Sequence, residues 1–270
     1  MEFKYISDLH RDSYFKHFRS QKEYEEYIFG DDSGGVLFIL GDVADRGSVL
    51  VETLRSIRKR YDRVIFVAGN HDLYIEKNGI FASKNALEKA KILQNELTKV
   101  GVDMLNGEVL EIENIKIGGS HMWYSPDYLK LKLREKNEGY AEEKYLSFWQ
   151  FSISDSKMIG QISPIDIYEK EIKKLENLKN KVDIFLSHVS PIPLDSYIAE
   201  EYRGSDLNTF FTFDGRDQLE NGVIKHFFYG HTHSAFEGDY AGVKLHCNPV
   251  GRPGENAIGY SGSVKKIIIN

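Results

Sequence analysis

Five short apolar runs, each ended at once by polar residues, constrain what this chain can fold into more than any other feature. They lie at residues 3–6, 36–40, 64–68, 182–186 and 223–229. Their length and β-branched content are typical of strands buried on both faces. Because helical periodicity fills several of the gaps between them, we expect an α/β fold with at least partly parallel strands.

Helices are expected at several places between these runs. Residues 49–57 and 86–97 carry apolar side chains at helical spacing, with Ser83 as the expected N-cap of the second helix. Ser163 followed by Pro164 is typical of the start of another. After Gly230 the pattern changes to strands and turns that end at residues 264–269, so we expect one flank of the fold to be antiparallel.

Residues 120–161 fit this pattern least. They hold eight aromatic residues interleaved with Lys, Arg and Glu. One interpretation is an amphipathic helical insertion whose aromatic side chains pack on the domain, and a second, compatible one is a cap over a functional site. No repeat or Pro/Ser-rich linker marks a boundary, so we expect residues 1–270 to form a single domain that carries this insertion.

Composition excludes several classes of protein. The single cysteine, Cys247, cannot form an internal disulfide, and no run approaches the ~18 apolar residues of a membrane span. The 41 acidic residues against 35 basic ones, a net charge of −6, argue against a broad nucleic-acid surface. With no signal-peptide pattern at residues 1–10, we expect a cytoplasmic protein that does not bind membranes.

Polar residues with metal-binding side chains follow each apolar run. Because the carboxyl ends of parallel strands meet at one edge of a sheet, we expect these side chains to converge. They are Asp8, His10, Asp42, Asn70, His188, His231 and His233. Carboxylate, imidazole and amide ligands without thiolate suit Mn, Fe or Zn. Seven ligands exceed what one ion needs, whereas two ions sharing a carboxylate would use them all.

Each motif also has a structural interpretation. Asp8 and Asp42 could cap the helices that follow, whereas G-N-H-D at 69–72 and G-H-T-H at 230–233 offer little to a hydrophobic core. Of the remaining histidines, His17 and His226 are interpreted as surface or strand residues, and His121 as a satisfied structural histidine or, alternatively, a pocket residue. The joint occurrence of all the motifs favours a metal site.

In this order the motifs D-x-H, G-D-x-x-D-R, G-N-H-[DE], a later His and G-H-x-H resemble those of the calcineurin-like metallophosphoesterase superfamily. The resemblance spans residues 8–233 and implies two mixed β-sheets packed as a sandwich and flanked by helices. It implies two divalent or trivalent metal ions, the first held by Asp8, His10 and His233, the second by Asn70, His188 and His231, and both bridged by Asp42.

The resemblance also implies how the site would work. A metal-bridging hydroxide would attack phosphorus, and His71 would protonate the leaving oxygen while Asp45 holds its ring. Arg46 is a phosphate contact or, alternatively, a surface salt-bridge partner. Asn70 and Arg252 are further candidates for substrate binding, although Arg252 follows an N-P-x-G motif that could be a plain turn.

We therefore expect a phosphoesterase whose partner is a small phosphorylated substrate, a phosphomonoester or a nucleotide-like phosphodiester. One alternative is a Ser/Thr-type protein phosphatase, although that branch carries Arg before its G-N-H-E where Ala68 stands here. Another is a non-catalytic scaffold that retains the fold. Such relatives lose ligands or the acid histidine, and this chain has them all.

Overall fold

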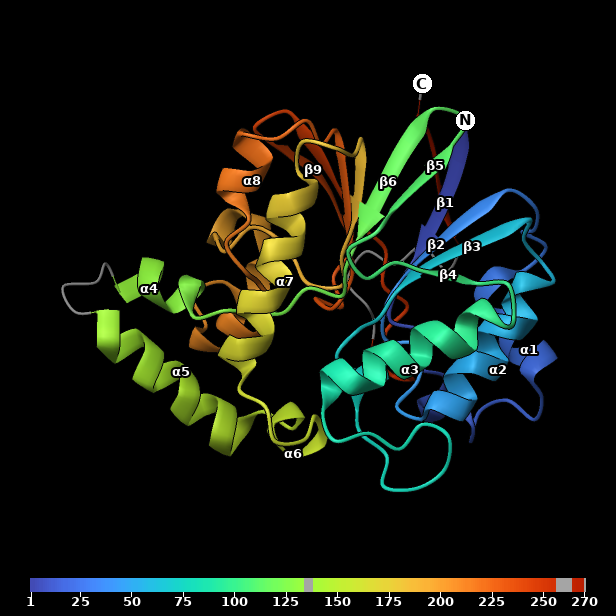
Figure 1. Ribbon diagram of the computed structural model, residues 1–270, viewed down its shortest axis with the longest axis horizontal. Helices are drawn as coiled ribbons and strands as arrows, with labels where there is room; N and C mark the ends of the chain where they lie inside the picture. Colours follow the sequence, from blue (N-terminus) through green and yellow to red (C-terminus); the bar gives the residue numbers. More distant parts are fainter. Residues whose placement is uncertain (134–137, 256–263, 270) are drawn as a thin grey trace.

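Two mixed β-sheets pack face to face in the computed structural model, which describes residues 1–133, 138–255 and 264–269 (Figure 1). The first sheet has the strand order β11-β1-β2-β3-β4. Its strands are β1 (Glu2–Ile6), β2 (Val36–Leu40), β3 (Arg63–Val67), β4 (Asp103–Met104) and β11 (Lys265–Ile268). The second sheet has the order β5-β6-β7-β8-β10-β9. Its strands are β5 (Val109–Ile112), β6 (Ile115–Gly119), β7 (Ile184–Leu186), β8 (His226–Tyr229), β9 (Phe236–Tyr240) and β10 (Val243–Cys247).

The central strands of both sheets are parallel, as their continuous apolar runs predict. Antiparallel pairs lie at the edges, where β11 pairs with β1, β5 with β6 and β9 with β10. The expectation of one antiparallel flank was therefore too narrow. Two of these pairs are tight hairpins whose turns, Glu113-Asn114 and Ala241-Gly242, have the positive φ angles that two-residue hairpin turns require.

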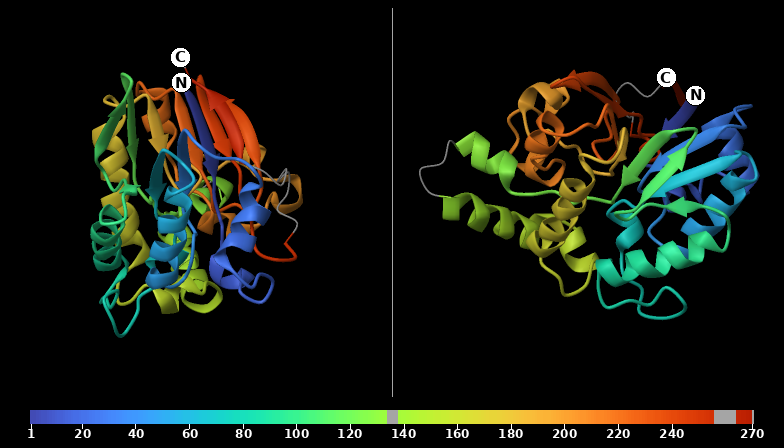
Figure 2. Two further views of the ribbon diagram at one scale, coloured as in Figure 1. Left: turned by 90° about the vertical axis from the view of Figure 1, so that its right-hand side faces the viewer. Right: turned by 45° about the horizontal axis from the view of Figure 1, so that its top comes forward.

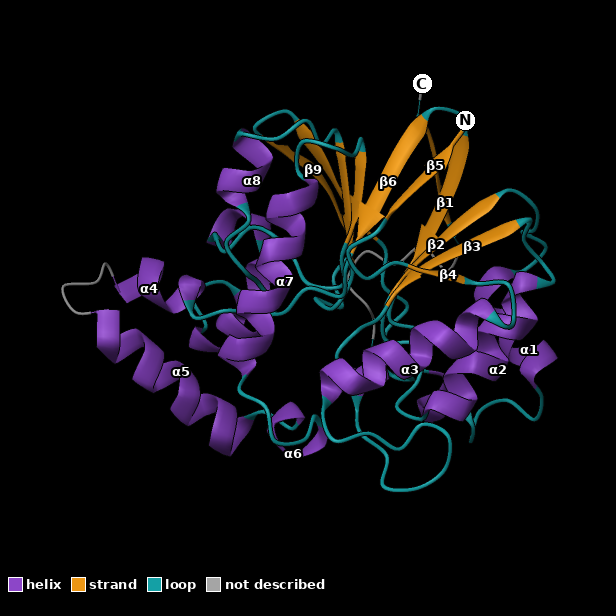
Figure 3. Ribbon diagram, in the orientation of Figure 1, coloured by secondary structure: helices purple, strands orange, loops and turns teal. Residues whose placement is uncertain are grey.

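Helices cover the outer faces of the sandwich (Figures 1 and 3). The first sheet is covered by α1 (Gln21–Phe29), α2 (Gly47–Arg58) and α3 (Ala86–Thr98), and the second by α7 (Pro164–Leu178) and α8 (Arg216–Glu220). Ser163 caps α7 and Pro164 is its first residue, as predicted. Asn85, not Ser83, caps α3, because its side chain accepts from the backbone N–H of Glu88.

The predicted strand at 223–229 is shorter in the structure, where β8 begins at His226. The backbone N–H of Val223 donates instead to the carbonyl of Lys179, at the end of α7, and that of Lys225 donates to the carbonyl of Asp183. Loop hydrogen bonds therefore replace ladder bonds over the first three residues of the apolar run.

The insertion is helical, with α4 (Asp127–Leu133), α5 (Glu138–Ser152) and α6 (Asp155–Met158), and the pair α4–α5 projects from the body of the molecule (Figures 1 and 2). Trp123, Tyr124 and Tyr145 are buried, whereas Tyr140 and Phe151 are exposed. Most of its aromatic side chains therefore pack as predicted. Within the described ranges, no helix combines the length and the apolar character needed to cross a bilayer.

Short 3₁₀ helices occupy several of the loops that follow the strands. They are η1 (Arg11–Tyr14), η2 (His71–Leu73), η3 (Asp195–Tyr197), η4 (Glu200–Tyr202) and η5 (Asp206–Phe210). Between the sheets lies an apolar layer that includes Phe38, Ile65, Ile117 and Phe228. This layer fixes the two sheets against each other, so that the loops after β1, β2, β3, β7 and β8 meet at one edge of the sandwich.

Candidate metal centre and active site

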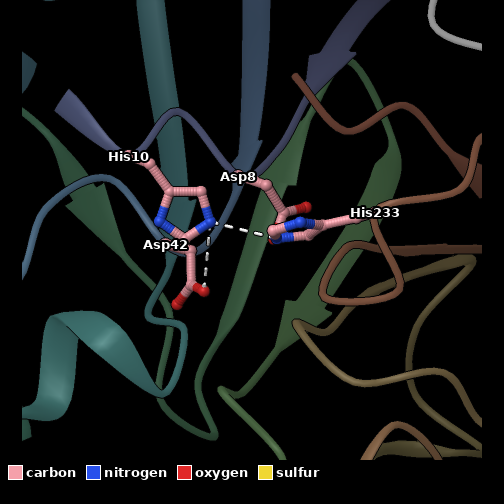
Figure 4. A group of neighbouring side chains, drawn as sticks. All are labelled: Asp8, His10, Asp42 and His233. Atoms are coloured by element: carbon pink, nitrogen blue, oxygen red, sulfur yellow. Dashed lines mark hydrogen bonds and ion pairs between the residues drawn. The ribbon is translucent and has the colours of Figure 1, made fainter. Parts of the chain in front are cut away.

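The four side chains drawn in Figure 4, Asp8, His10, Asp42 and His233, form a first cluster of ligand atoms. The Nε2 atoms of His10 and His233 lie 3.0 Å apart. Asp8 Oδ1 lies 3.4 Å from His233 Nε2, and Asp42 Oδ2 lies 3.8 Å from His10 Nε2. The loops that follow strands β1, β2 and β8 supply these residues, which are up to 225 positions apart in the chain.

Asp42 also belongs to a second cluster, with His188 and His231. Its other oxygen, Oδ1, lies 3.4 Å from His188 Nε2, and Asn70 Oδ1 lies 3.2 Å from the same nitrogen. Asp42 thus turns one carboxylate oxygen toward each cluster. All seven sequence-predicted ligands are brought together, and Asp42 has the central place expected of a bridging carboxylate.

The spacing of these atoms fits two metal ions. Ligand atoms held at about 2.1 Å from one first-row ion lie about 3.0 Å apart at a right angle and about 3.4 Å apart at a tetrahedral angle. Four of the five separations given above are between 3.0 and 3.4 Å. The donors are nitrogen and oxygen without sulfur, which suits Mn, Fe or Zn.

Hydrogen bonds behind the ligands determine which imidazole nitrogen each one offers. His188 Nδ1 donates to the carbonyl of Leu40 at 2.7 Å, so Nε2 keeps the free lone pair. His231 Nε2 donates to the carbonyl of Phe210 at 2.8 Å, which leaves Nδ1 for the site. His233 Nδ1 lies 2.7 Å from the carboxylate of Glu255. Such outer contacts fix the ring and raise its basicity toward a metal.

The charges of the cluster are strongly coupled. Burial raises the pKa of Asp8, but His233 outweighs it and lowers that pKa to about 2. Burial opposes the protonation of His188, yet Asp42 raises the pKa of this histidine to about 9. The pKa of Asp42 is held well below its usual value by His188 and His71, although burial acts in the other direction. Without metal, protons on histidine balance the carboxylates, and metal ions would displace them.

The backbone of the ligand loops is strained. Asp8, His10, Asp42, His231 and His233 all have positive φ angles, between 41° and 69°. This region is rare for residues other than glycine and marks functional sites when the surrounding structure enforces it. The loops also approach closely, because a Cβ on Gly69 would collide with the carboxylate of Asp42.

Asp72 joins two of the ligand loops, a role that the sequence motif alone did not reveal. Its buried carboxylate accepts backbone N–H groups of Asp42, Val43, Ala44 and Gly69 at 2.8–3.0 Å. Burial and the charge of Asp42 raise the pKa of Asp72 to about 7. The four donors offset this cost and clamp the loop after β2 to the loop after β3.

Asp155, at the start of α6, is a second residue that sequence reasoning missed. It accepts a hydrogen bond from Asn70 Nδ2 at 3.0 Å, which turns the amide oxygen of Asn70 toward His188. The hydroxyl groups of Tyr74 and Tyr124 also donate to this carboxylate. In the sequence, Asp155 is one carboxylate among others in the aromatic insertion and lies in no recognised motif, so motif spacing could not have predicted that it orients Asn70.

His71 lies beside the clusters, with its ring 5.1 Å from that of His10. Its Nδ1 donates to Asp45 at 2.8 Å, as the resemblance implied, and its Nε2 accepts from Arg252 Nη2 at 2.9 Å. Burial lowers the pKa of His71, but Asp42 and Asp45 outweigh burial and raise it. Arg46 instead binds Asp12 at 3.0 Å on the surface, so the salt-bridge alternative is the one observed.

Two of the other histidines lie away from the ligand clusters, and neither ring nitrogen of the buried His121 has a hydrogen-bond partner among the described residues. His121 is buried 3.2 Å from Glu171, and His226 lies on β8 with its Nδ1 3.1 Å from His246 Nε2. Neither lines the cavity at the metal centre. That cavity has a volume of about 620 Å³ and includes Asp42, Asn70, His71, His231 and His233 in its wall.

Comparison with known proteins agrees with this geometry. The family model described as calcineurin-like phosphoesterase matches residues 1–235. A phosphopantetheinyl hydrolase from Mycobacterium tuberculosis superposes with a TM-score of 0.73 at 18% identity, covering 99% of this chain and 96% of that chain, a likeness of fold. An uncharacterised protein of Acanthamoeba polyphaga mimivirus is 21% identical over 262 residues, 92% of this chain and 90% of that protein.

A symmetrical bis(5'-nucleosyl)-tetraphosphatase from Aromatoleum aromaticum is 40% identical over 60 residues, which is 22% of each chain. The family match covers most of the present chain and includes all seven ligand positions and His71. The fold, two mixed sheets flanked by helices, is also that of the structural neighbour. The chain belongs to the calcineurin-like phosphoesterase family, which is of the dinuclear-metal type, and its structure holds two matching clusters of candidate ligands.

Proposed function

We propose that this protein is a dinuclear-metal-dependent phosphoesterase that hydrolyses a phosphomonoester or a nucleotide-like phosphodiester. The observation that carries the proposal is Asp42, whose two oxygens face two ligand clusters at the wall of a cavity that also exposes His71. Asp8, His10 and His233 would hold one ion, Asn70, His188 and His231 the other, and Asp42 both. The bound ions would lower the pKa of an attacking water and stabilise charge on the phosphoryl group.

His71 is suited to protonate the leaving oxygen. Its Nε2 lies 2.9 Å from Nη2 of Arg252 and faces the cavity, while Asp45 accepts from Nδ1–H and so fixes the ring. To act as an acid, Nε2 must exchange the hydrogen bond from Arg252 for a proton, and the raised pKa of His71, due to Asp42 and Asp45, favours that proton. Because His71 lies next to Asn70 in the chain, the acid is positioned by the same loop that supplies a metal ligand.

Arg252 is the better candidate for the phosphate contact. Its guanidinium lines the cavity, and its Nε–H is buried without an acceptor among the described residues. A buried donor of this kind calls for a partner, and a phosphate oxygen supplies one with matching geometry. Arg46 is 58% exposed and paired with Asp12, so it is not positioned for this task.

The test is to purify the protein, measure its metal content and assay 4-nitrophenyl phosphate against bis(4-nitrophenyl) phosphate with added Mn. We expect close to two ions per chain and turnover of at least one ester, abolished by a chelator and restored by metal. Metal-loaded protein that turns over no monoester or diester would contradict the proposal and favour a non-catalytic scaffold.

A further inference from the structure

The cavity extends well past the metal ligands and His71. Its volume of about 620 Å³ equals that of about 20 water molecules at ~30 Å³ each, several times what a phosphate and one water need. The additional space lies between residues 152–155 of the insertion and residues 198–212, which hold η4 and η5. The group that is esterified to the phosphate could therefore occupy this additional space.

Apolar side chains from both of these segments line the space, interspersed with serine and asparagine side chains. We call the apolar side chains the apolar wall, formed by Ile153, Ile198, Tyr202, Leu207 and Phe211. Tyr202, Leu207 and Phe211 remain 49%, 43% and 39% exposed. Apolar side chains grouped at a cavity gain free energy when an apolar ligand removes them from water.

The apolar wall is held in place by the insertion. Asp206, in η5, binds Lys132 of α4 and Lys144 of α5. The Tyr128 hydroxyl donates to Asp195 at 2.6 Å. These contacts order the segment before any ligand arrives, which reduces the entropy that binding costs.

Buried aromatic rings form the base of the same segment. Phe210 stacks on Tyr145, with ring centroids 4.9 Å apart, and contacts Tyr124 edge to face at 5.5 Å. Tyr124 in turn lies parallel to the ring of His231 at 5.9 Å. The apolar wall is thus linked by packed rings to a metal ligand, so a group on the wall has a fixed position relative to the metal centre.

Charge limits what this space accepts. Among the cavity-lining residues that the structure describes, Arg252 is the only lysine or arginine, and it lies against His71. The histidines of the lining, His71, His231 and His233, all belong to the metal-centre end of the cavity. Asp155 and Glu255 contribute negative charge to the wall. A second phosphate or a carboxylate in the leaving group would find no positive partner there and would lose its hydration.

We infer that the apolar wall binds the leaving group, and that the substrate is the phosphate ester of an uncharged, apolar or aromatic alcohol carrying a single phosphate. This inference rests on the proposed function and names its substrate class. In the reaction, water adds to phosphorus and releases one proton to the solvent, the P–O bond to the alcohol breaks, and the alcohol leaves with a proton from His71. The solvent then returns a proton to His71, so the products are the alcohol and inorganic phosphate. The insertion then acts as the support of a specificity site.

The test compares 2-(1-naphthyl)ethyl phosphate with ethyl phosphate, because both release a primary alcohol of similar basicity. We expect the naphthyl ester to have at least tenfold higher kcat/KM. Tyr202→Ala combined with Leu207→Ala should remove most of this preference through KM and leave ethyl phosphate unchanged. Neither residue is a candidate metal ligand, whereas Phe211 contacts His231 and is left intact. Tyr27→Ala, at a 57% exposed tyrosine of α1, is the matched control.

Binding of the non-hydrolysable 2-(1-naphthyl)ethylphosphonate, measured by calorimetry on metal-loaded protein, separates the two hypotheses. Tight binding that the double variant weakens at least tenfold supports the apolar wall even if no ester turns over, an outcome that would refute only the proposed function. Equal kcat/KM for the two esters, or phosphonate binding unaffected by the double variant, would overturn the inference and leave the phosphoesterase proposal standing. Phosphoglycolate, with its charged leaving group, should be hydrolysed more slowly than ethyl phosphate, and faster hydrolysis would also overturn it.

Discussion

Replacing Asp72 with alanine should destabilise the protein more than any single surface change. The substitution removes the acceptor of four buried backbone N–H groups, those of Asp42, Val43, Ala44 and Gly69. A buried donor left without a partner costs about 1–3 kcal/mol, so the lower bound for four is about 4 kcal/mol. The total stability of a domain is only about 5–15 kcal/mol, so this is a large fraction of it.

Urea unfolding followed by tryptophan fluorescence measures this effect. Chelator is included, so that lost metal binding does not add to the difference. With an m-value of ~3 kcal/mol per M, the midpoint should fall by at least about 1.3 M. The midpoint of Asp72→Asn should lie between those of the wild type and Asp72→Ala, because the single amide oxygen of asparagine can still accept from two of the four donors. Asp62→Ala is the control, because Asp62 accepts one exposed N–H, that of Gly35, and should change the stability by less than about 1 kcal/mol.

A midpoint for Asp72→Ala within about 0.3 M of the wild type would refute this reasoning. It would show that water or a relaxed loop satisfies the four donors, and that Asp72 does not hold the loops after β2 and β3 together. If Asp72→Ala were as stable as the wild type and also bound two metal ions, Asp72 would have no role in organising the site.

Four further results are expected. His71→Ala should lower kcat about 10²- to 10⁴-fold with metal content unchanged, whereas Asp42→Ala should lose metal. Elemental analysis measures the metal content of both variants. Loss of metal in His71→Ala would contradict the roles assigned to His71 and Asp42. Asp155→Ala, which frees the amide of Asn70, should weaken Mn binding about 10- to 100-fold in a chelator competition, and unchanged affinity would refute the orienting role. Arg252→Ala should raise KM. Arg46→Ala, which loses the pair with Asp12 and the contact with the ring of Phe15, should change KM by less than about twofold in the same assay. A larger effect on KM in Arg46→Ala than in Arg252→Ala would refute the assignment. Burial lowers the pKa of His226 from 6.5 to about 4, so the unfolded chain binds a proton that the folded chain lacks, and stability falls by about 1–3 kcal/mol as pH drops through this window. The unfolding temperature, measured against pH, should depend less steeply on pH in His226→Gln than in the wild type. An unchanged slope would show that His226 does not contribute to this pH dependence.

Much of the candidate site was predictable because its signals are local. Each ligand follows a buried strand directly, and parallel strands place their carboxyl ends together whatever the rest of the chain does. Asp8, Asp42 and His233 could therefore be assigned to one centre although β1, β2 and β8 are far apart in sequence. The helix that Ser163 caps was predicted for the same reason, because a cap acts within one turn.

The errors arose where a long-range contact determines the local structure. Val223 continues an apolar run, but its N–H is taken by the end of α7, so β8 starts later. Ser83 and Asn85 are both good caps, and only the path of the chain into α3 decided between them. Periodicity says nothing about such choices, because it describes the faces of an element and not its neighbours.

The sequence by itself thus indicated the family, the seven candidate ligands and the imidazole of His71, since each of these residues lies in a short motif next to a strand. Only the tertiary structure decided which residues hydrogen-bond to them. Asp155 accepts from Asn70, 85 positions away in the chain, and Arg252 hydrogen-bonds to His71, 181 positions away. It also decided that Arg46 faces Asp12 and that the insertion supports the apolar wall. The physical reason is that a motif records the chemistry a residue can perform, whereas its partners depend on how the two sheets and the insertion pack.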